Sequence, residues 1–172
     1  MTDTEITNEI VLRPWSHSDA SNLVKYANNH DISKNLMNAF PHPYTLEAAE
    51  AFIERVSHTV PVQVMAIDLE GEAIGAVGVH PQEDVYCKNA ELGYWLAEPY
   101  WGKGIMTFVV KQMVQYGFEH FQIQRIFARP FEGNTGSMKV LEKAGFTLEA
   151  HLKKTFFKEG KFLDEYIYAV RR

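Results

Sequence analysis

The stretch from Glu91 to Thr107 decides the fold, and it reads ELGYWLAEPYWGKGIMT. It opens as a strand, breaks at Pro99, passes through Gly102 and Gly104, and continues into a run that favours a helix. Glycines adopt backbone conformations closed to other residues, so successive N–H groups can point at one ligand. The positive end of the helix dipole adds to that attraction. The sequence therefore predicts an anion site for a phosphorylated ligand.

The spacing of the glycines excludes two common phosphate-binding motifs. A mononucleotide P-loop ends in Gly-Lys followed by serine or threonine, whereas Lys103 lies between two glycines and is followed by Gly104. A dinucleotide fingerprint needs a third glycine three residues after the second, where this chain has Thr107. An unrelated nucleotide-binding protein is therefore a remote alternative.

Three short stretches of sequence, in the same order along the chain, resemble motifs of the GNAT superfamily of acetyltransferases. The stretch 101–106 resembles the second half of its acyl-coenzyme-A motif, Gln/Arg-x-x-Gly-x-Gly/Ala, and the flanking words ELGYWL (91–96) and NTGS…EKAGF (134–146) resemble its ribosomal-protein N-acetyltransferase branch. The resemblance extends from Leu12 to Tyr166. Two positions depart from the motif: its Gln/Arg is aromatic here (Tyr100 or Trp101), and its last Gly/Ala is the bulkier Met106. Backbone amides need no particular side chain at the first position, so the resemblance still implies a cofactor site.

The resemblance implies that acetyl-CoA binds at this loop as a co-substrate. Lys103 either pairs with a phosphate or is solvated, and the Asn134 amide either bonds the pantetheine arm or only caps a helix. A backbone N–H near Leu96 or Ala97 is the expected donor to the oxyanion. The expected cofactor-binding residues are Leu96, Ala97, Trp101, Gly102, Lys103, Gly104, Ile105, Met106, Thr107 and Asn134.

Glu91 is the candidate catalytic base, because it lies on the strand that leads into the loop and the family uses a carboxylate there. An ordinary glutamate has a pKa of ~4.3, so taking a proton directly from an alkyl ammonium near ~10 is uphill by roughly 8 kcal/mol. For an α-ammonium near ~8 the cost is about 5 kcal/mol. Three roles therefore remain for Glu91: burial raises its pKa, it relays the proton through a water, or it mainly orients the amine. The alternative is a surface carboxylate at a strand end.

Ser137 is the candidate donor to the departing sulfur of the thioester. It lies one turn along the helix that Asn134 caps, on the same face. A thiol with a pKa near ~8.5 leaves readily, so the hydroxyl is a hydrogen-bond donor rather than an essential acid. A second capping residue in the first turn of the helix is the alternative.

Composition narrows the class of protein. The chain has 172 residues, 46% of them hydrophobic, which predicts one domain over residues 1–172 with a single core. A net charge of −5 without a basic run argues against nucleic acid, and the apolar stretches are too short to span a membrane. The acidic N-terminus and the single cysteine, Cys87, favour a reducing cytoplasm over secretion. The seven histidines have no metal-ligand spacing, so no metal is expected.

Periodicity and turn residues predict the order β-α-α-β-β-β-α-β-α-β-β. The expected strands are 9–13, 62–69, 73–80, 90–97, 123–130, 146–154 and 162–170, and the expected helices begin at Ser16, Thr45, Thr107 and Asn134. Residues 30–44 are expected to be irregular. One strand–helix–strand crossover makes a single parallel pair. We therefore expect an α+β fold with a mostly antiparallel mixed sheet of about seven strands and helices on both faces. The resemblance implies that its parallel pair splays around the acyl-CoA loop.

These observations predict an acetyl-CoA-dependent N-acetyltransferase in which the amine attacks the thioester directly. The acceptor is either a protein N-terminal α-amine or a small primary amine, and the resemblance implies that the chain can pair as a homodimer. A non-catalytic domain that binds acyl-CoA as a signal is the alternative, and the presence of both Glu91 and Ser137 argues against it.

Overall fold

The computed structural model describes residues 3–172, with side-chain surroundings from Ile6 onward. Its described residues group into two units, one formed by residues 3–78 and 94–109, the other by residues 79–93 and 110–172. Strands β3 (Glu72–Pro81) and β4 (Asn89–Leu96) contribute residues to both units.

Seven strands form one mixed sheet in the order β1-β2-β3-β4-β5-β7-β6. The other five strands are β1 (Ile10–Arg13), β2 (Val64–Leu69), β5 (Arg125–Ala128), β6 (Thr147–Lys158) and β7 (Lys161–Arg171). β4 and β5 are parallel, whereas β1–β2, β2–β3, β5–β7 and β6–β7 are antiparallel. The expected α+β fold with one parallel pair is confirmed. The parallel ladder ends at Glu91 and Phe127, although β4 itself continues to Leu96.

Local hydrogen bonds explain where the helices begin. The helices are α1 (Asp3–Asn8), α2 (Ala20–Ala27), α3 (His30–Ser33), α4 (Leu46–Ser57), α5 (Ile105–His120) and α6 (Thr135–Lys143). As expected, the side chain of Thr45 caps α4 by accepting from the N–H of Ala48. The expectation that residues 30–44 are irregular was wrong in part. The side chain of Asn29 accepts from the N–H of Asp31 and starts the short helix α3.

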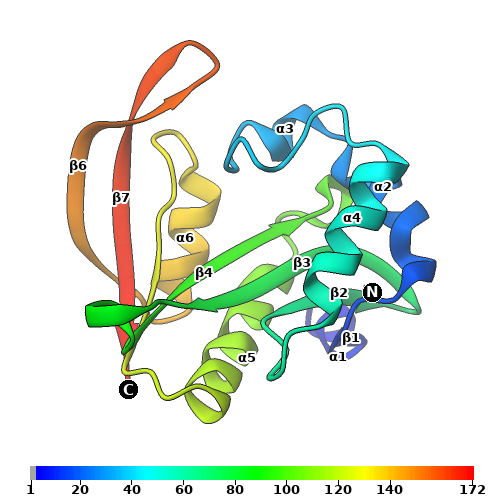
Figure 1. Ribbon diagram of the computed structural model, residues 1–172, viewed down its shortest axis with the longest axis horizontal. Coiled ribbons are helices and arrows are strands. Elements are labelled where there is room, and N and C mark those ends of the chain that lie inside the picture. Colours follow the sequence, from blue (N-terminus) through cyan, green and yellow to red (C-terminus); the bar gives the residue numbers. More distant parts are fainter. Residues whose placement is uncertain (1–2) are drawn as a thin grey trace. The chain divides into compact units, whose positions relative to one another are not determined.

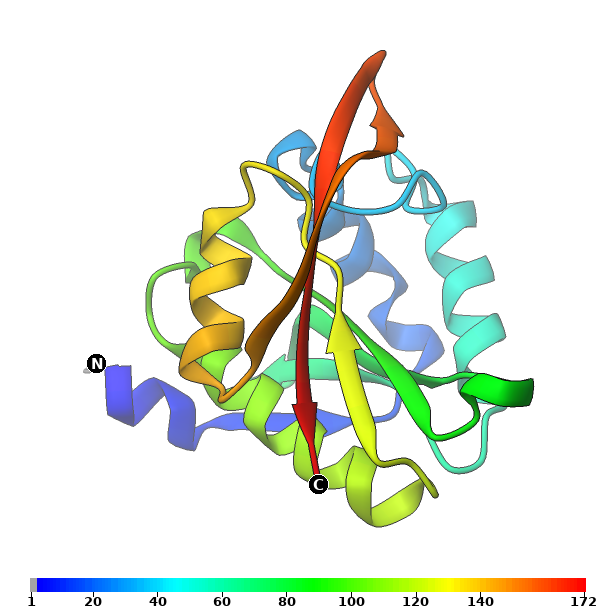
Figure 2. The ribbon, with the colours of Figure 1, turned by 90° about the vertical axis from the view of Figure 1, so that its left-hand side faces the viewer.

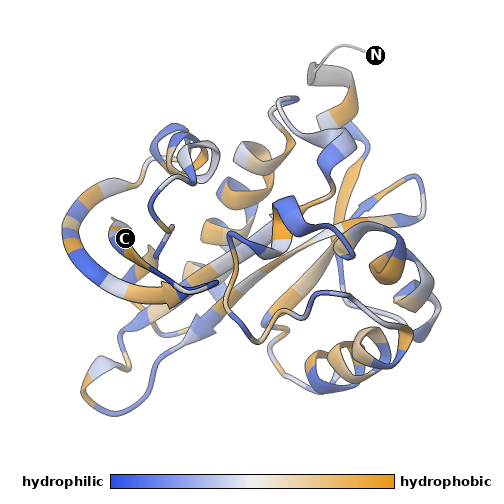
Figure 3. Cartoon of the chain, turned by 90° about the horizontal axis from the view of Figure 1, so that it is seen from above, coloured by the Kyte–Doolittle hydropathy of each residue, from blue (hydrophilic) through white to orange (hydrophobic). Residues whose placement is uncertain are grey.

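The first unit has an apolar core between α2, α4 and its strands. Leu23 of α2 and Ile53 of α4 are fully buried, and they belong to one cluster with Ala66 of β2 and Trp95 of β4. The two helices lie side by side (Figure 1). Hydrophobic and hydrophilic residues alternate along the turns of the helices (Figure 3), which is the amphipathic pattern that places one face on a core.

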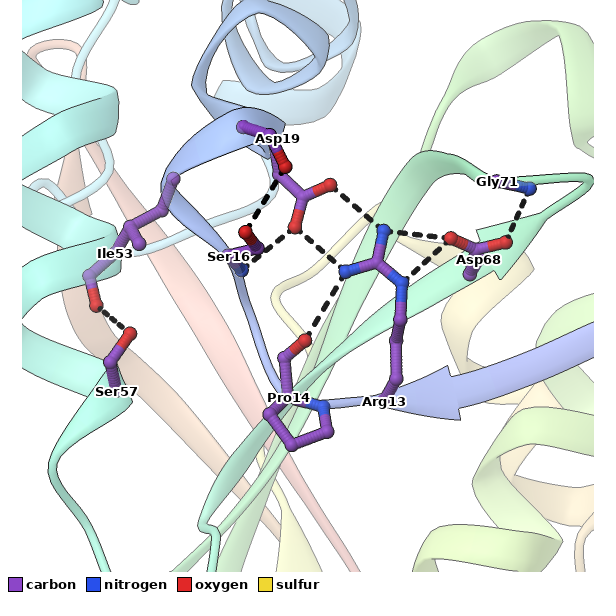
Figure 4. A network of polar contacts seen from close by, with 9 residues as sticks. Arg13, Pro14, Ser16, Asp19, Ile53, Ser57, Asp68 and Gly71 are labelled. Atoms are coloured by element: carbon purple, nitrogen blue, oxygen red, sulfur yellow. Dashed lines mark hydrogen bonds and ion pairs between the residues drawn. The ribbon is translucent and has the colours of Figure 1, made fainter.

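A charged network ties the first strand to this unit (Figure 4). Arg13 at the end of β1 donates two hydrogen bonds to Asp19, at 2.7 and 2.8 Å, and one to Asp68 on β2 at 2.7 Å. Both carboxylates are buried. Asp68 also accepts from the N–H of Gly71, which fixes the turn between β2 and β3. The bound Asp19 carboxylate raises the pKa of Arg13 further, so the guanidinium stays charged.

In the second unit, β6 and β7 form a long antiparallel ribbon that is bent by a wide bulge (Figure 2). The ladder passes from the pair Leu152–Glu165 to the pair Phe156–Leu163, so three residues of β6 lie opposite Asp164 alone. The carboxylate of Asp164 stabilises the bulge by accepting one hydrogen bond from Lys153 Nζ at 2.8 Å and one from the backbone N–H of Lys154 at 3.0 Å.

Candidate functional site

The glycine loop joins the end of β4 to the start of α5. A 3₁₀ turn spans Glu98–Tyr100, and α5 begins at Ile105. Between them, Gly102 and Gly104 have φ angles of +78° and +75°. Residues with a Cβ rarely adopt this left-handed region, so the loop requires glycine at both positions.

The space around these two glycines is open. A Cβ built at either position meets no heavy atom within 4 Å, whereas one at Gly75 would lie 2.5 Å from the backbone oxygen of Trp95. Close packing therefore requires a glycine at Gly75 inside the sheet, whereas the left-handed backbone conformation requires glycine at Gly102 and Gly104 in the loop. An anion can approach the loop backbone closely, and the unpaired first amides of α5 follow directly.

The side chains that follow the loop belong mainly to the core. Ile105 and Met106 keep only 1% and 8% of their surface exposed, and Thr107 is half-buried. Their contribution to ligand binding therefore comes from the backbone. The bulk of Met106, which replaces a small residue of the motif, points into the protein instead of the loop opening.

Two hydrogen bonds fix the strand end before the loop. The indole Nε1 of Trp101 donates to the carbonyl of Leu96 at 2.7 Å, so this aromatic residue ties the loop back to β4. The N–H of Ala97 donates to the carbonyl of Ile74 at 2.8 Å. That bond occupies the Ala97 amide, which is one of the two expected oxyanion donors.

Aromatic and charged side chains of the first unit support the loop. Lys103 Nζ lies 5.4 Å from the centre of the Tyr100 ring, and the Tyr100 hydroxyl lies 3.5 Å from that of Tyr26 on α2. Tyr26 in turn donates to Glu72 at 2.9 Å. Hydrogen bonding to Tyr26 and partial burial raise the pKa of Tyr100 to about 12. Tyr100 is therefore neutral at physiological pH. Asn29 donates to Glu98 at 2.6 Å and holds the start of the turn.

In the second unit, the carboxylate of Glu91 is engaged by Arg129. Arg129 Nε and Nη2 donate to the two oxygens of Glu91, each at 2.9 Å, which is a bidentate pair. The side chains keep 29% and 32% of their surface exposed. Hydrogen bonding to Glu91 raises the pKa of Arg129 above its usual value. A carboxylate has about four lone-pair sites, so Glu91 can still accept a hydrogen from a ligand or a water.

A second carboxylate, Glu165 of β7, contacts the same guanidinium. Its Oε1 lies 3.6 Å from Arg129 Nη1, and its side chain is only 8% exposed. Sequence reasoning missed both Arg129 and Glu165. Arg129 follows the end of β5 in a Pro-containing segment that carries no motif, and Glu165 lies in a strand where a charged residue usually faces solvent.

Asn134 and Ser137 lie at the start of α6. The side-chain oxygen of Asn134 accepts from the N–H of Ser137 at 3.2 Å, which makes Asn134 the helix cap. This bond uses only the oxygen of the amide, so the NH₂ group remains the part that suits a ligand. Ser137 is half-buried and contributes to the cap through its backbone N–H.

The structure thus places the expected site residues in two groups. Leu96, Ala97 and the residues 101–107 belong to the first unit, and Glu91, Asn134 and Ser137 belong to the second. Among the described residues, no group of three or more His, Cys, Asp or Glu side chains is arranged to hold a metal ion. No helix within residues 3–172 is long and apolar enough to cross a membrane.

Comparisons with known proteins agree with these features. The family model described as Acetyltransferase (GNAT) domain matches residues 9–147. The chain is 27% identical over 175 residues to the uncharacterized N-acetyltransferase p20 of Bacillus licheniformis, covering 98% of this chain and 96% of the relative. It is 25% identical over 162 residues to spermidine N(1)-acetyltransferase of Escherichia coli K12, covering 90% and 82%.

A solved structure of RimL, a ribosomal L7/L12 alpha-N-protein acetyltransferase in complex with coenzyme A, has the same fold. The likeness has a TM-score of 0.84 at 20% identity and covers 96% of both chains. The family match spans most of the sequence, including the whole glycine loop and the cap of α6. The chain belongs to the acetyltransferase (GNAT) domain family.

Proposed function

We propose that the chain transfers the acetyl group of acetyl-CoA to a primary amine by direct attack of the amine on the thioester. The observation that carries this proposal is the glycine loop before α5. Two left-handed glycines with open space at their Cβ positions expose consecutive amides beside a helix N-terminus. This is the chemistry that a pyrophosphate requires, so the residues present fit acetyl-CoA.

In the proposed reaction, the backbone does most of the binding. The amides of the loop and of the first turn of α5 hold the pyrophosphate, and Lys103, which lies in the loop between the two glycines, adds a positive charge. The Leu96 amide is the proposed donor to the oxyanion that forms when the amine adds to the thioester carbonyl. The Asn134 NH₂ group is the proposed partner of the pantetheine arm.

The proton and the leaving group determine the two side-chain roles. The amine nitrogen forms a bond to the carbonyl carbon, the carbon–sulfur bond breaks, and the thiolate leaves. Glu91 takes the first proton from the ammonium before the attack, directly or through a water, and passes it to solvent. The second proton, which the nitrogen loses after it has added to the carbonyl, protonates the departed thiolate. The bidentate pair with Arg129 fixes the orientation of Glu91 and leaves it lone pairs for that transfer. Ser137 is the proposed hydrogen-bond donor to the thiolate.

Two acceptor classes are supported by relatives. One relative is named for acetylating spermidine, a small polyamine, and a structural neighbour is named for acetylating the α-amine of a ribosomal protein. A free primary amine is common to both. The proposal therefore includes a small-molecule amine and a peptide α-amine as acceptors.

The proposal is tested by the release of free thiol from acetyl-CoA in the presence of an amine panel. The panel contains spermidine, alanine amide and a short peptide with a free α-amine and a blocked carboxyl end. Thiol release that depends on at least one amine, with the acetylated product identified by mass, is expected. A protein that binds acetyl-CoA but releases thiol with none of them would be a binding domain, and the proposed reaction would be wrong.

A further inference from the structure

Asn29 uses both ends of its side-chain amide. Its oxygen accepts from the N–H of Asp31 at 2.8 Å and caps α3, and its NH₂ group donates to the carboxylate of Glu98 at 2.6 Å. The two partners have opposite needs, because an N–H requires an acceptor and a carboxylate requires a donor. Aspartate would cap the helix equally well but would offer Glu98 only acceptors. The cap alone therefore does not account for asparagine at this position, whereas the bond to Glu98 does.

The bond to Glu98 reaches the glycine loop through the backbone. Glu98 begins the 3₁₀ turn Glu98–Tyr100, and its carbonyl accepts from the N–H of Trp101 at 3.0 Å. Trp101 directly precedes Gly102. A side chain that fixes Glu98 therefore also fixes the residue from which the loop starts, and Asn29 does so from 69 positions away in the sequence.

The two glycines have no side chains that could hold the loop. No heavy atom lies within 4 Å of a Cβ built at Gly102 or Gly104, and glycine has more backbone freedom to lose than any other residue. Ordering such a loop when a ligand binds reduces the affinity, unless flanking residues already hold the loop. An anchor at Glu98 therefore tightens the binding of a ligand that the loop amides contact.

A second contact from α2 supports the other end of the same turn. The hydroxyl of Tyr26 lies 3.5 Å from that of Tyr100, and the two rings pack edge to face with their centres 6.1 Å apart. Tyr26 is held in turn by its hydrogen bond to Glu72 at 2.9 Å. The turn is thus contacted at its first residue by Asn29 and at its last by Tyr26, both from the end of α2.

We propose that Asn29 is a positioning residue for acetyl-CoA, because by holding Glu98 it fixes the glycine loop in the conformation that binds the pyrophosphate. This inference rests on the proposed acetyl transfer, with acetyl-CoA as the co-substrate. Asn29 acts through Glu98 and not by contact with the cofactor. Since the same amide caps α3, the affinity for the cofactor and the start of α3 depend on one side chain.

The test is the Kd for acetyl-CoA of Asn29→Asp, measured by calorimetry. Aspartate keeps an oxygen that can cap α3, so the Tm of the free protein should change by no more than about 1–2 °C. It also places a second carboxylate against Glu98. The Kd should rise about three- to tenfold, the range for one hydrogen bond to a charged group at a partly exposed position. A lowered Tm with an unchanged Kd would leave Asn29 a purely structural role.

Asn28→Asp is the matched control, because it adds the same negative charge one position earlier. The side-chain oxygen of Asn28 accepts from the N–H of Tyr44, and aspartate can accept that bond too. The Kd of this variant should equal that of the wild type. An equal rise in both aspartate variants would show a general effect of charge on an anionic ligand and would overturn the role of Asn29.

Reversing the direction of the bond provides a rescue. When Asn29→Asp is combined with Glu98→Gln, the glutamine supplies the donor and the aspartate the acceptor, so the two side chains can bond again. The Kd should return to within about twofold of the wild-type value. A double variant that binds as weakly as Asn29→Asp would refute positioning through Glu98.

These outcomes are separate from those of the proposed reaction, because binding is measured without an acceptor. Wild-type affinity in Asn29→Asp would refute this inference and leave the acetyl-transfer proposal intact. The expected pattern of Kd values without any thiol release would support the positioning role in a binding domain. A wild-type protein that does not bind acetyl-CoA would overturn both.

Discussion

Replacing Gly104 by alanine should selectively remove the stabilisation that acetyl-CoA gives the protein. At about a hundredfold excess over its Kd, a ligand that binds only the folded state adds roughly 2.7 kcal/mol. For a domain of this size, that gain corresponds to a rise of about 5–10 °C in Tm. The methyl group that this substitution adds would project into the open space that we assign to the pyrophosphate. A hundredfold weaker Kd would reduce the ligand gain to about 0.4 kcal/mol, or roughly 1 °C.

Gly71 provides a matched control for the strain of this substitution. It has a φ of +86° against +75° for Gly104, and both have open space around the Cβ position. Each alanine should therefore lower the stability of the free protein by a similar amount, about 1–2 kcal/mol. Differential scanning fluorimetry with and without acetyl-CoA measures both effects. If Gly71→Ala and Gly104→Ala keep the same ligand-induced rise, the loop does not bind the pyrophosphate.

Four further predictions concern single side chains. Glu91→Gln should lower turnover most at low pH, where the acceptor amine is most fully protonated, and a pH–rate profile that overlays the wild type would exclude Glu91 as the base. Ser137→Ala should reduce turnover about ten- to a few-hundredfold with little change in the Kd for acetyl-CoA or in the urea midpoint. Asn134→Ala should instead lower stability by about 1 kcal/mol, because Asn134 supplies the cap, and the reverse pattern would exchange the two roles. The pKa of Asp164 is held at about 2 by hydrogen bonds from Lys153, from the backbone N–H of Lys154 and from His151. The stabilisation that the Asp164 carboxylate gives is therefore complete above its unfolded pKa of ~3.9 and is lost as the pH falls towards 2. The urea midpoints of wild type and Asp164→Asn should therefore converge between pH 5 and 2.5, and a gap that stays constant would contradict this sign.

Local signals in the sequence were sufficient for most of the fold. Glycine turns, such as the one at Gly71, and caps, such as Thr45, act within four residues, so their effects can be inferred from neighbouring positions. The short helix α3 escaped prediction because Pro41 and Pro43 dominate the composition of the surrounding segment. Its start depends on a single side-chain bond from Asn29.

The candidate site was only partly predictable, because its parts depend on different distances along the chain. The glycine loop is continuous in sequence, and its function depends on backbone angles that glycine reveals. The environment of Glu91 depends on Arg129, which is 38 residues away and is itself contacted by Glu165, 74 residues from Glu91. No local pattern reports such a contact. The bond that occupies the Ala97 amide is equally invisible in sequence, since its partner, Ile74, is a backbone carbonyl.

The network around Arg13 sets a limit on how far the chain can be shortened from its N-terminal side. Asp19 and Asp68 are buried, and the guanidinium of Arg13 is the cation that both of them contact. A chain that begins just before β1 would keep this network complete. A chain that begins after Arg13 would bury two carboxylates without their cation, a defect that costs about 3–5 kcal/mol in fully buried pairs and less here, where Arg13 keeps 29% of its side chain exposed. The smallest stable version of this acetyltransferase therefore has to include β1, although the residues of the candidate site begin nearly eighty positions later.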